Sequence, residues 1–335
     1  MSGAPGPGGP RDSHEIPGHR GSPRLRGYLR IGTRGSALAL VQAEEVRSAL
    51  ASRFPGLEIQ IQVIRTRGDR VLDSTLSKID GKGLFIREIE EALAEGRIDL
   101  AVHSLKDLPT SLPPELTLGG VLPREDPRDA LVSRDGRGLA ELRPGQRVGT
   151  SSLRRRAQLL AVNPGLRVPD IRGNVDTRLA RLRQGRCDAL VLAACGLRRA
   201  GFGDRITEHL EPRLMLPAAC QGIIGMEVRR DDRRTAGLVA AVSHGPTLDV
   251  AEAERAFLHR LEGGCRVPAG CLALVQDGEG VVDGMVADPD GGRVVRLRRS
   301  GPAAELRRLA GELACDILRR GGAEILASIR NEQPG

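Results

Sequence analysis

Aromatic residues are almost absent from this chain of 335 residues, which has no Trp, one Tyr and four Phe. Proteins that hold single-stranded nucleic acid stack the bases on aromatic side chains. The sequence therefore excludes a base-stacking platform, and the core must be built from Leu, Val, Ile and Ala. The length suffices for two or three domains.

Long apolar runs and paired cysteines are also missing. The longest apolar runs, such as the one at Ala189–Leu197, are far too short to cross a bilayer. Residues 1–27 are rich in Gly and Pro and lack an apolar stretch, so we predict a disordered tail and no secretory signal. The six cysteines contain no C-x-x-C pair. This favours reduced thiols in a cytoplasmic protein that does not enter a membrane.

Lysine is scarce as well, because arginine supplies nearly all of the positive charge. The only lysines are Lys78, Lys82 and Lys106, which lie in one part of the chain. The clustering suggests a site that prefers an ammonium to a guanidinium, although three lysines can also fall together by chance. The net charge of +8 and the pI of about 9.8 indicate an anionic partner. Nucleic acid, a membrane surface and a polycarboxylate all satisfy that description.

Short β-rich runs alternate with helical patterns, which predicts an α/β fold with mainly parallel strands. The predicted elements at the start of the chain are strands at 28–33, 58–66 and 98–103 and helices at 36–50 and 85–95. After about Leu248 a capped helix is followed by strand-like runs that are broken by Asp-Gly and Gly-Gly, and then by two helical segments flanked by Arg. That pattern is typical of a smaller α+β domain.

Two short motifs occur twice. Arg30–Ser36 is echoed by Arg147–Ser152, and Gly96–Asp99 by Gly185–Asp188. Generic turns could produce such repeats, but the two repeated motifs together predict two related lobes. Facing lobes would form a cleft, where strand-to-helix turns present free backbone N–H groups to anions.

The segment from His103 to Pro109 carries a candidate catalytic acid. Asp107 is expected at the end of a predicted strand, where it would face a cleft, and the neighbouring Lys106 can keep it ionised. It could then stabilise a cation or shuttle a proton to and from a ring nitrogen. The alternative is an Asx-turn that simply ends the strand before Pro109. His103 has no partner at metal-ligand spacing, so we interpret it as structural and predict no metal site.

Arginines cluster where helices are predicted to begin, at Arg154, Arg155, Arg172 and Arg178, with Arg199 farther on. Guanidinium groups bind carboxylates at two points, so with Arg34 and Ser36 they suit a ligand that carries several carboxylates or phosphates. We expect Arg156, Arg181 and Arg183 to be solvated. Nucleic acid is a less suitable ligand, since no recognition-helix pattern accompanies these arginines.

Cys265 lies in a Gly-Gly-Cys-Arg turn, where its thiol could be exposed and its thiolate favoured. Such a thiol can act as a nucleophile or an attachment point. We expect Cys187, Cys195 and Cys315, inside apolar runs, to be buried and structural.

Taken together and in order, these motifs resemble the porphobilinogen deaminase (hydroxymethylbilane synthase) family from about Tyr28 to the C-terminus. The resemblance rests on RIGTRGSALALVQA, GKGLFIREIE, AVHSLKDLPT, VGTSSLRRRAQL, IRGNVDTRLARL, CQGIIGMEV and ERAFLHRLEGGCRVP. It implies an α/β fold with two periplasmic-binding-protein-like lobes of mainly parallel sheets and a small α+β C-terminal domain. The domains implied are 28–122 with 223–242, then 123–222, then 245–335.

The resemblance also implies a function. The enzyme would condense four porphobilinogen molecules on a dipyrromethane cofactor, bound through a thioether to Cys265, and release 1-hydroxymethylbilane. Asp107 would assist loss of ammonia, stabilise the resulting cation and manage the proton of the attacking pyrrole. We expect a monomer that does not bind nucleic acid.

Further site residues are carried over by position. The cofactor would contact Lys82, Ser104, Lys106, Thr150, Ser152, Arg154, Arg155, Arg172 and Gly173. The substrate would contact Arg34, Ser36, Phe85, Arg172, Arg178 and Arg199.

Two cysteines depart from the family pattern. Cys220 stands where the family usually has Gly, and its side chain is expected to stiffen the connection between the lobes. Cys271 replaces a small residue and offers a second thiol near Cys265. Two rival functions use the same features: an exported solute-binding module, which needs neither Cys265 nor Asp107, and a nucleic-acid-binding protein, whose affinity would fall steeply with salt.

Overall fold

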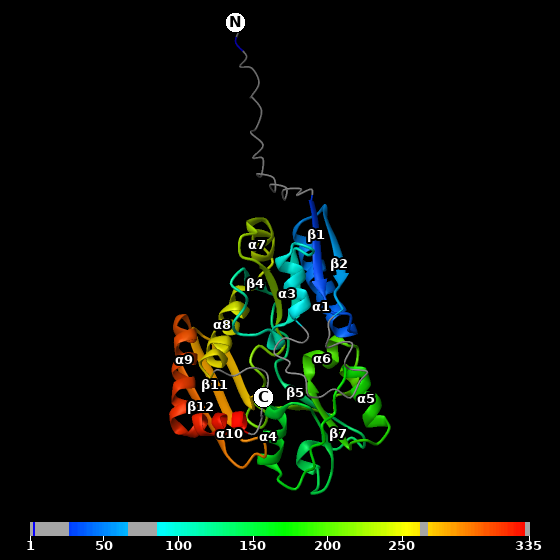
Figure 1. Ribbon diagram of the computed structural model, residues 1–335, viewed down its shortest axis with the longest axis vertical. Helices are drawn as coiled ribbons and strands as arrows, with labels where there is room; N and C mark the ends of the chain where they lie inside the picture. The colour runs from blue at the N-terminus through cyan, green and yellow to red at the C-terminus, as the bar shows by residue number, and fades with distance from the viewer. Residues whose placement is uncertain (1–2, 4–26, 66–85, 262–266, 332–335) are drawn as a thin grey trace.

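The computed structural model describes residue 3 and residues 27–65, 86–261 and 267–331. Its strands form three separate sheets (Figure 1). Lys78, Lys82, Phe85, Cys265 and nearly all of the predicted tail lie outside the described residues, so the predictions about them are not addressed by the structure.

The first sheet has the strand order β2-β1-β3-β9-β4. Strand β1 is parallel to β2 and β3, whereas β9 is antiparallel to β3 and β4, so β9 alone points the opposite way. The elements of this lobe are β1 (Gly27–Thr33), α1 (Ala37–Arg53), β2 (Leu57–Val63), α3 (Arg87–Ala94), β3 (Leu100–Ser104), β4 (Leu116–Val121), β9 (Ile224–Arg229) and α7 (Arg233–Ala240). The five elements predicted at the start of the chain are confirmed to within three residues at each end.

The second sheet has the order β6-β7-β5-β8 and repeats this arrangement. Here β5 is antiparallel to β7 and β8, and β6 is parallel to β7. In each lobe one strand, β9 or β5, runs opposite to the others. It is the first strand that the chain forms after it crosses from the other lobe. The elements are β5 (Asp129–Ser133), β6 (Val148–Gly149), α4 (Leu153–Val162), α5 (Val175–Arg183), β7 (Ala189–Ala193), α6 (Ala194–Arg199) and β8 (Glu208–Leu210). The prediction of two α/β lobes with mainly parallel sheets is confirmed.

The repeated motifs make the same contacts in both lobes. Arg30 donates from its backbone N to Asp99 and from its guanidinium to Asp99 and to the Gly96 carbonyl oxygen. Arg147 donates in the same way to Asp188 and to the Gly185 carbonyl oxygen. Both glycines have φ of +71°, a conformation that favours Gly. The two motifs that are repeated in the sequence thus form the same structural unit in each lobe.

The third sheet, β10-β11-β12, is antiparallel and packs against α8 and α9 (Figure 1). Strands β10 and β11 are joined at Asp277-Gly278, where both residues have positive φ, as a tight hairpin turn requires. The elements are α8 (Gly245–Arg260), β10 (Ala269–Gln276), β11 (Glu279–Ala287), β12 (Val294–Pro302), α9 (Leu306–Ile317) and α10 (Ala323–Asn331). The predicted α+β C-terminal domain is confirmed.

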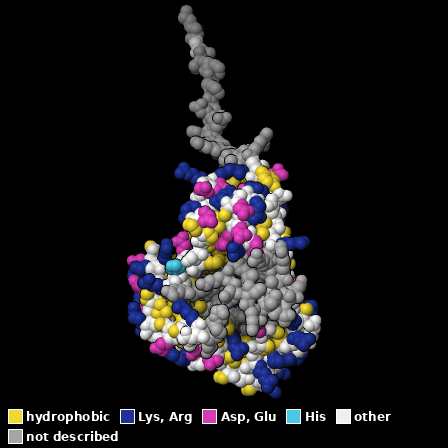
Figure 2. Space-filling model, in the orientation of Figure 1, with side chains coloured by type: hydrophobic (Ala, Val, Ile, Leu, Met, Phe, Trp, Pro, Cys, Tyr) yellow, Lys and Arg dark blue, Asp and Glu magenta, His cyan; other side chains and the backbone are white. Residues whose placement is uncertain are grey.

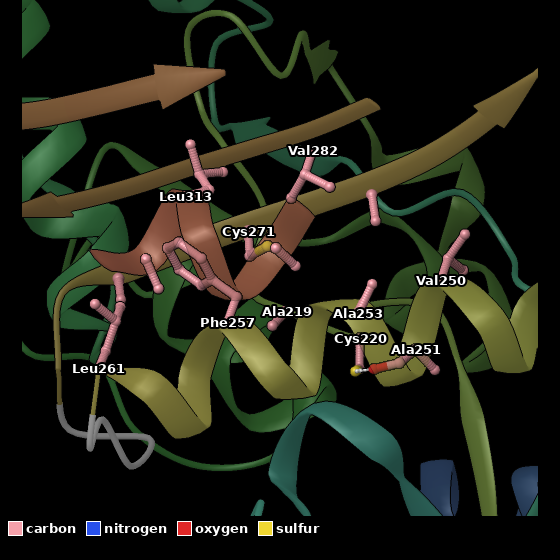
Figure 3. Packing of buried hydrophobic residues seen from close by; sticks show 14 of the residues in the cluster. Ala219, Cys220, Val250, Ala251, Ala253, Phe257, Leu261, Cys271, Val282 and Leu313 are labelled. Carbon is pink, nitrogen blue, oxygen red and sulfur yellow. Dashed lines mark hydrogen bonds between the residues drawn. The ribbon is translucent and has the colours of Figure 1, made fainter. Parts of the chain in front are cut away.

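The core of this domain extends to the chain that links the two lobes. Phe257 of α8 points toward Leu313 of α9 and Cys271 of β10, and Ala219 and Cys220 lie against the same helix (Figure 3). Cys220 has φ of 61°, so its side chain does not exclude the left-handed conformation that Gly would permit. For an L residue that conformation costs about 1–2 kcal/mol. Here it is held by a hydrogen bond from the Cys220 backbone N to Glu254.

Glu254 is a buried carboxylate that ties three segments together. It is fully buried on α8 and accepts hydrogen bonds from the Arg124 guanidinium at 2.6 Å and from the Ala273 backbone N at 2.7 Å, besides that from Cys220. Arg124 follows β4 and Cys220 precedes β9, so one side chain joins both interlobe connections to the C-terminal domain.

Glu90, a half-buried carboxyl that is influenced by the buried Glu227, predicts a pH dependence. Burial and the neighbouring Glu227 raise the pKa of Glu90 on α3 to about 7, with Glu115 acting in the same direction and His103 opposing them. A carboxyl whose pKa is higher in the folded chain is protonated preferentially there. The free energy of unfolding should therefore decrease as pH rises from about 4.5 toward 7.

Glu90→Gln should remove this effect. We expect urea denaturation to give the variant and the parent similar stabilities at pH 5 and to find the variant more stable at pH 8. Glu58→Gln, at an exposed position on β2, is the matched control. Parallel stability curves for Glu90→Gln and the parent between pH 5 and pH 8 would contradict the assignment.

Candidate functional site

Asp107 lies directly after β3, in the 3-10 turn η1 (Leu105–Asp107). Its carboxylate is exposed, and in the described part of the chain no hydrogen bond is made to it, so the predicted alternative of an Asx-turn is not formed. Leu105 and Leu108 on either side are 1% and 4% exposed and belong to the cluster that contains Phe257 of α8. The acid is therefore held on an anchored turn with its carboxylate in solvent.

Arg178 of the second lobe is influenced by the charge of this acid. Burial and the charge of Arg155 lower its pKa to about 10, while the carboxylates of Asp170 and Asp107 act in the opposite direction. The charge of Asp107 thus reaches a guanidinium that belongs to the other lobe. The Arg178 side chain donates to the Gly173 carbonyl oxygen at 2.7 Å, which fixes it at the start of α5.

Arg154 and Arg155 form a buried group with one carboxylate. They are 4% and 6% exposed, and their guanidinium groups both donate to Asp129 at 2.8 Å. These two arginines hold the pKa of Asp129 well below its usual range despite its burial. Two cations and one anion leave the group with a net positive charge inside the lobe. Burial of such a charge is costly unless an anion accompanies it.

A hydrogen-bonded chain joins Lys106 of the first lobe to this group. The Lys106 Nζ donates to the Gln221 Oε1 at 3.4 Å, and the Gln221 Nε2 donates to the Asp129 Oδ1 at 2.8 Å. Gln221 is fully buried in the connection between the lobes. Predicted site residues of both lobes are therefore linked through two residues that the sequence analysis did not single out.

Arg199 lies at a second contact between the lobes. Its Nε is 3.0 Å from Glu45 on α1 and 3.3 Å from Glu125, and its side chain is 8% exposed. Its guanidinium is thus paired with two carboxylates at the lobe boundary. We predicted this residue as a substrate ligand.

The remaining predicted residues lie at turns and helix starts. Ser36 and Ser152 cap α1 and α4 by accepting hydrogen bonds from the backbone N–H groups of Ala39 and Arg155. Arg172 is exposed and pairs with Asp170 at 2.8 Å. The others with described positions are Arg34, which is half-buried after β1, Thr150, which is buried, Ser104, which accepts from Gln42, and Gly173, with φ of +105°.

The cysteines differ sharply in accessibility. Cys271 is fully buried, and burial and Glu254 raise the pKa of its thiol well above the usual range, so it is a poor nucleophile. Cys187 and Cys195 are buried as predicted, whereas Cys315 is half-buried beside Arg260, so the prediction for Cys315 is wrong. Its position on α9 places it next to a groove that the apolar run around it did not reveal.

Two kinds of feature are absent from the described ranges. No group of three or more His, Cys, Asp or Glu side chains there could hold a metal ion. None of the described helices is long and apolar enough to cross a membrane.

On the face drawn in Figure 2, Lys and Arg side chains are spread over all three parts of the molecule, while Asp and Glu side chains are most frequent on the first lobe. The charged residues predicted for the site are one carboxylate, Asp107, the ammonium of Lys106 and a set of guanidinium groups. Such a set can bind a ligand with several carboxylates and exchange a proton with it.

Comparisons with known proteins show the family of this chain. Residues 29–237 match the family model "Porphobilinogen deaminase, dipyromethane cofactor binding domain", and residues 248–318 match "Porphobilinogen deaminase, C-terminal domain". The porphobilinogen deaminase of Roseiflexus castenholzii is 52% identical over 90% of this chain and 100% of its own length. That of Syntrophobacter fumaroxidans is 47% identical over 90% and 97%. Among solved structures, the periplasmic aliphatic sulphonate binding protein SsuA from Escherichia coli is 18% identical, with a TM-score of 0.38 over 70% of each chain.

Proposed function

The chain belongs to the porphobilinogen deaminase family, and from that premise we propose which of its residues carry the reaction. It is a transferase of porphyrin and haem biosynthesis, a hydroxymethylbilane synthase. It condenses four porphobilinogen molecules head to tail on a dipyrromethane cofactor and releases 1-hydroxymethylbilane.

The residues of the second lobe suit the cofactor. The net positive charge of Arg154, Arg155 and Asp129 fits a ligand that carries carboxylates. We propose that these arginines hold the cofactor together with Thr150, Ser152, Arg172, Gly173, Ser104, Lys106 and Lys82, and that Cys265 attaches it through a thioether. When bound, the dipyrromethane supplies the pyrrole carbon to which the first substrate unit is joined.

We assign the acid and base role to Asp107. A protonated Asp107 donates to the amino group that leaves porphobilinogen as ammonia, and its carboxylate then faces the positive charge left on the substrate. The same carboxylate accepts the proton lost from the pyrrole carbon when the rings are joined. Its anchored backbone and solvent-exposed carboxylate support this role, because the group must meet successive substrates at one fixed position.

The substrate carboxylates are assigned to Arg178, Arg172, Arg34 and Ser36, with Phe85 near the ring and Arg199 at the lobe boundary. Arg199 would have to release Glu45 or Glu125 to bind a ligand. The observation that carries the proposal is the hydrogen-bonded chain that runs from Lys106, beside Asp107, through Gln221 to Asp129 and its two arginines. A small acid bound beside this chain would lie near both a proton donor and cations.

The wider assignments follow from the same proposal. The domains are 28–122 with 223–242 (the Asp107 lobe), 123–222 (the arginine-rich lobe) and 245–335 (the domain of cofactor attachment). We propose a cytoplasmic monomer whose positive charge serves carboxylates and not nucleic acid.

Release of ammonia from porphobilinogen tests the substrate assignment. We expect Arg178→Leu to raise the KM for porphobilinogen by at least about tenfold, since it removes a charged contact worth about 1.5–3 kcal/mol. Arg183→Leu, an exposed position on the same helix, should leave KM unchanged. Equal KM values for the Arg178→Leu variant and the parent would refute the assignment of Arg178.

A further inference from the structure

A groove outside the interlobe site lies between β4, α8 and α9 and has a volume of about 940 Å³. Its walls are Leu112, Leu116 and Leu118 on the side of the first lobe and charged residues of α8 and α9 on the side of the C-terminal domain. Seven arginines and two glutamates line it. A volume of this size is in the range that holds a small molecule.

We propose that this groove is a second ligand site, which binds a small molecule carrying two or more oxyanions, carboxylate or phosphate, and is separate from the interlobe site that contains Asp107 and Arg178. None of the described residues that we assign to the catalytic reaction lines the groove.

The charge balance of the groove supports an anionic ligand. Arg299, Arg308 and Arg319 are paired with Glu312, Asp316 or Glu305. The other four, Arg230, Arg255, Arg260 and Arg307, make no ion pair with a carboxylate of the described residues. Four guanidinium groups that pair with no carboxylate of the described residues, around one concave surface, can bind an oxyanion at several points.

Arg255 is the most informative of the four because it is half-buried at the foot of the groove. Its guanidinium donates only to backbone carbonyl oxygens, those of Leu108 at 3.2 Å, Pro109 at 2.7 Å and Thr110 at 3.3 Å. Burial lowers the pKa of its side chain. A partly desolvated cation that contacts only neutral acceptors gains more from an incoming anion than a solvated one does.

The same contacts connect the groove to the reaction. The residues that directly follow Asp107 are Leu108, Pro109 and Thr110. An anion that binds Arg255 therefore weakens the hydrogen bonds from Arg255 to the segment beside Asp107. This consequence rests on the proposed role of Asp107, whereas binding to the groove does not. We therefore expect an oxyanion in the groove to change kcat while it leaves KM for porphobilinogen nearly constant.

Calorimetric titration of the holoenzyme with pyrophosphate and, separately, with citrate tests binding at an ionic strength kept constant with NaCl. The variant is Arg230→Gln with Arg307→Gln, and the control is Arg183→Gln with Arg53→Gln, two exposed arginines outside the groove. We expect at least one probe to bind, with affinity at least about tenfold weaker in the groove variant and unchanged in the control. Binding of pyrophosphate alone would identify a phosphorylated ligand, and binding of citrate alone a polycarboxylate.

Three results would overturn the proposal. The first is equal affinity in the groove variant and the parent, and the second is no binding of either probe. The third is a loss of affinity in Arg178→Leu but not in the groove variant, because that result would place the probe in the interlobe site. A melting temperature of the groove variant within a few degrees of the parent shows that it is folded. Binding is measured without turnover, so the test of the groove does not depend on the assignment of Asp107.

Discussion

Asp107→Asn is expected to lower kcat by about 10² to 10⁴-fold, the usual contribution of a positioned general acid or base. The amide has the same shape but can neither supply the proton to the leaving amine nor accept the proton from the pyrrole. The free energy of unfolding should hardly change, because the Asp107 side chain is exposed and the turn is held by Leu105 and Leu108. Single-turnover and steady-state assays with porphobilinogen measure the loss.

Asp176→Asn is the matched control, an exposed carboxyl in the first turn of α5 in the facing lobe. It should turn over at the rate of the parent. Normal turnover by Asp107→Asn would remove this residue from the mechanism. A collapse in stability would instead assign it a structural role.

Glu254→Ala is expected to lower the free energy of unfolding by about 3–5 kcal/mol, the usual cost of breaking a buried ion pair from one side. The substitution leaves the Arg124 guanidinium buried without its carboxylate, and it removes the acceptor of the Cys220 and Ala273 backbone N–H groups. Cys220 would then keep its left-handed conformation without the hydrogen bond that holds it.

Urea denaturation measures this effect, with two comparisons. Glu252→Ala, an exposed position on the same helix, should cost less than about 1 kcal/mol. Glu254→Gln keeps an acceptor oxygen and should lose less than Glu254→Ala. A loss below about 1 kcal/mol for Glu254→Ala would show that Arg124 finds another partner.

Local features of the fold could be predicted because their causes lie close together in sequence. Ser36 and Ser152 precede the helices that they cap, and Asp277-Gly278 is a two-residue turn whose chemistry specifies a hairpin. The repeated contacts of Arg30 with Asp99 and of Arg147 with Asp188 were visible as repeated motifs, although the ion pairs themselves were not.

The connections between lobes could not be predicted, since they join residues far apart in the chain. Glu254 meets Arg124 across 130 positions, and Arg199 meets Glu45 across 154. Asp129 was overlooked because a single acid at the start of an apolar strand looks like an ordinary strand end. Its role emerges only when α4 places Arg154 and Arg155 above it.

The same long-range contacts explain how two lobes can form one site. Gln221 links Lys106 to Asp129, Arg199 joins α6 to α1, and Glu254 fixes both connecting segments to the C-terminal domain. These contacts lie at or beside the connections between the lobes. Any movement that makes room for a lengthening product would therefore have to pivot near them or break them.

The intact mass of the purified protein, followed by peptide mapping, tests whether Cys265 carries the dipyrromethane cofactor. We expect an excess equal to two linked pyrrole units, located on the peptide that contains Cys265, either as purified or after addition of porphobilinogen. We also expect an unmodified Cys271, because that thiol is fully buried. A chain that stays unmodified after addition of porphobilinogen, or an adduct on any other residue, would refute the attachment of the cofactor to Cys265.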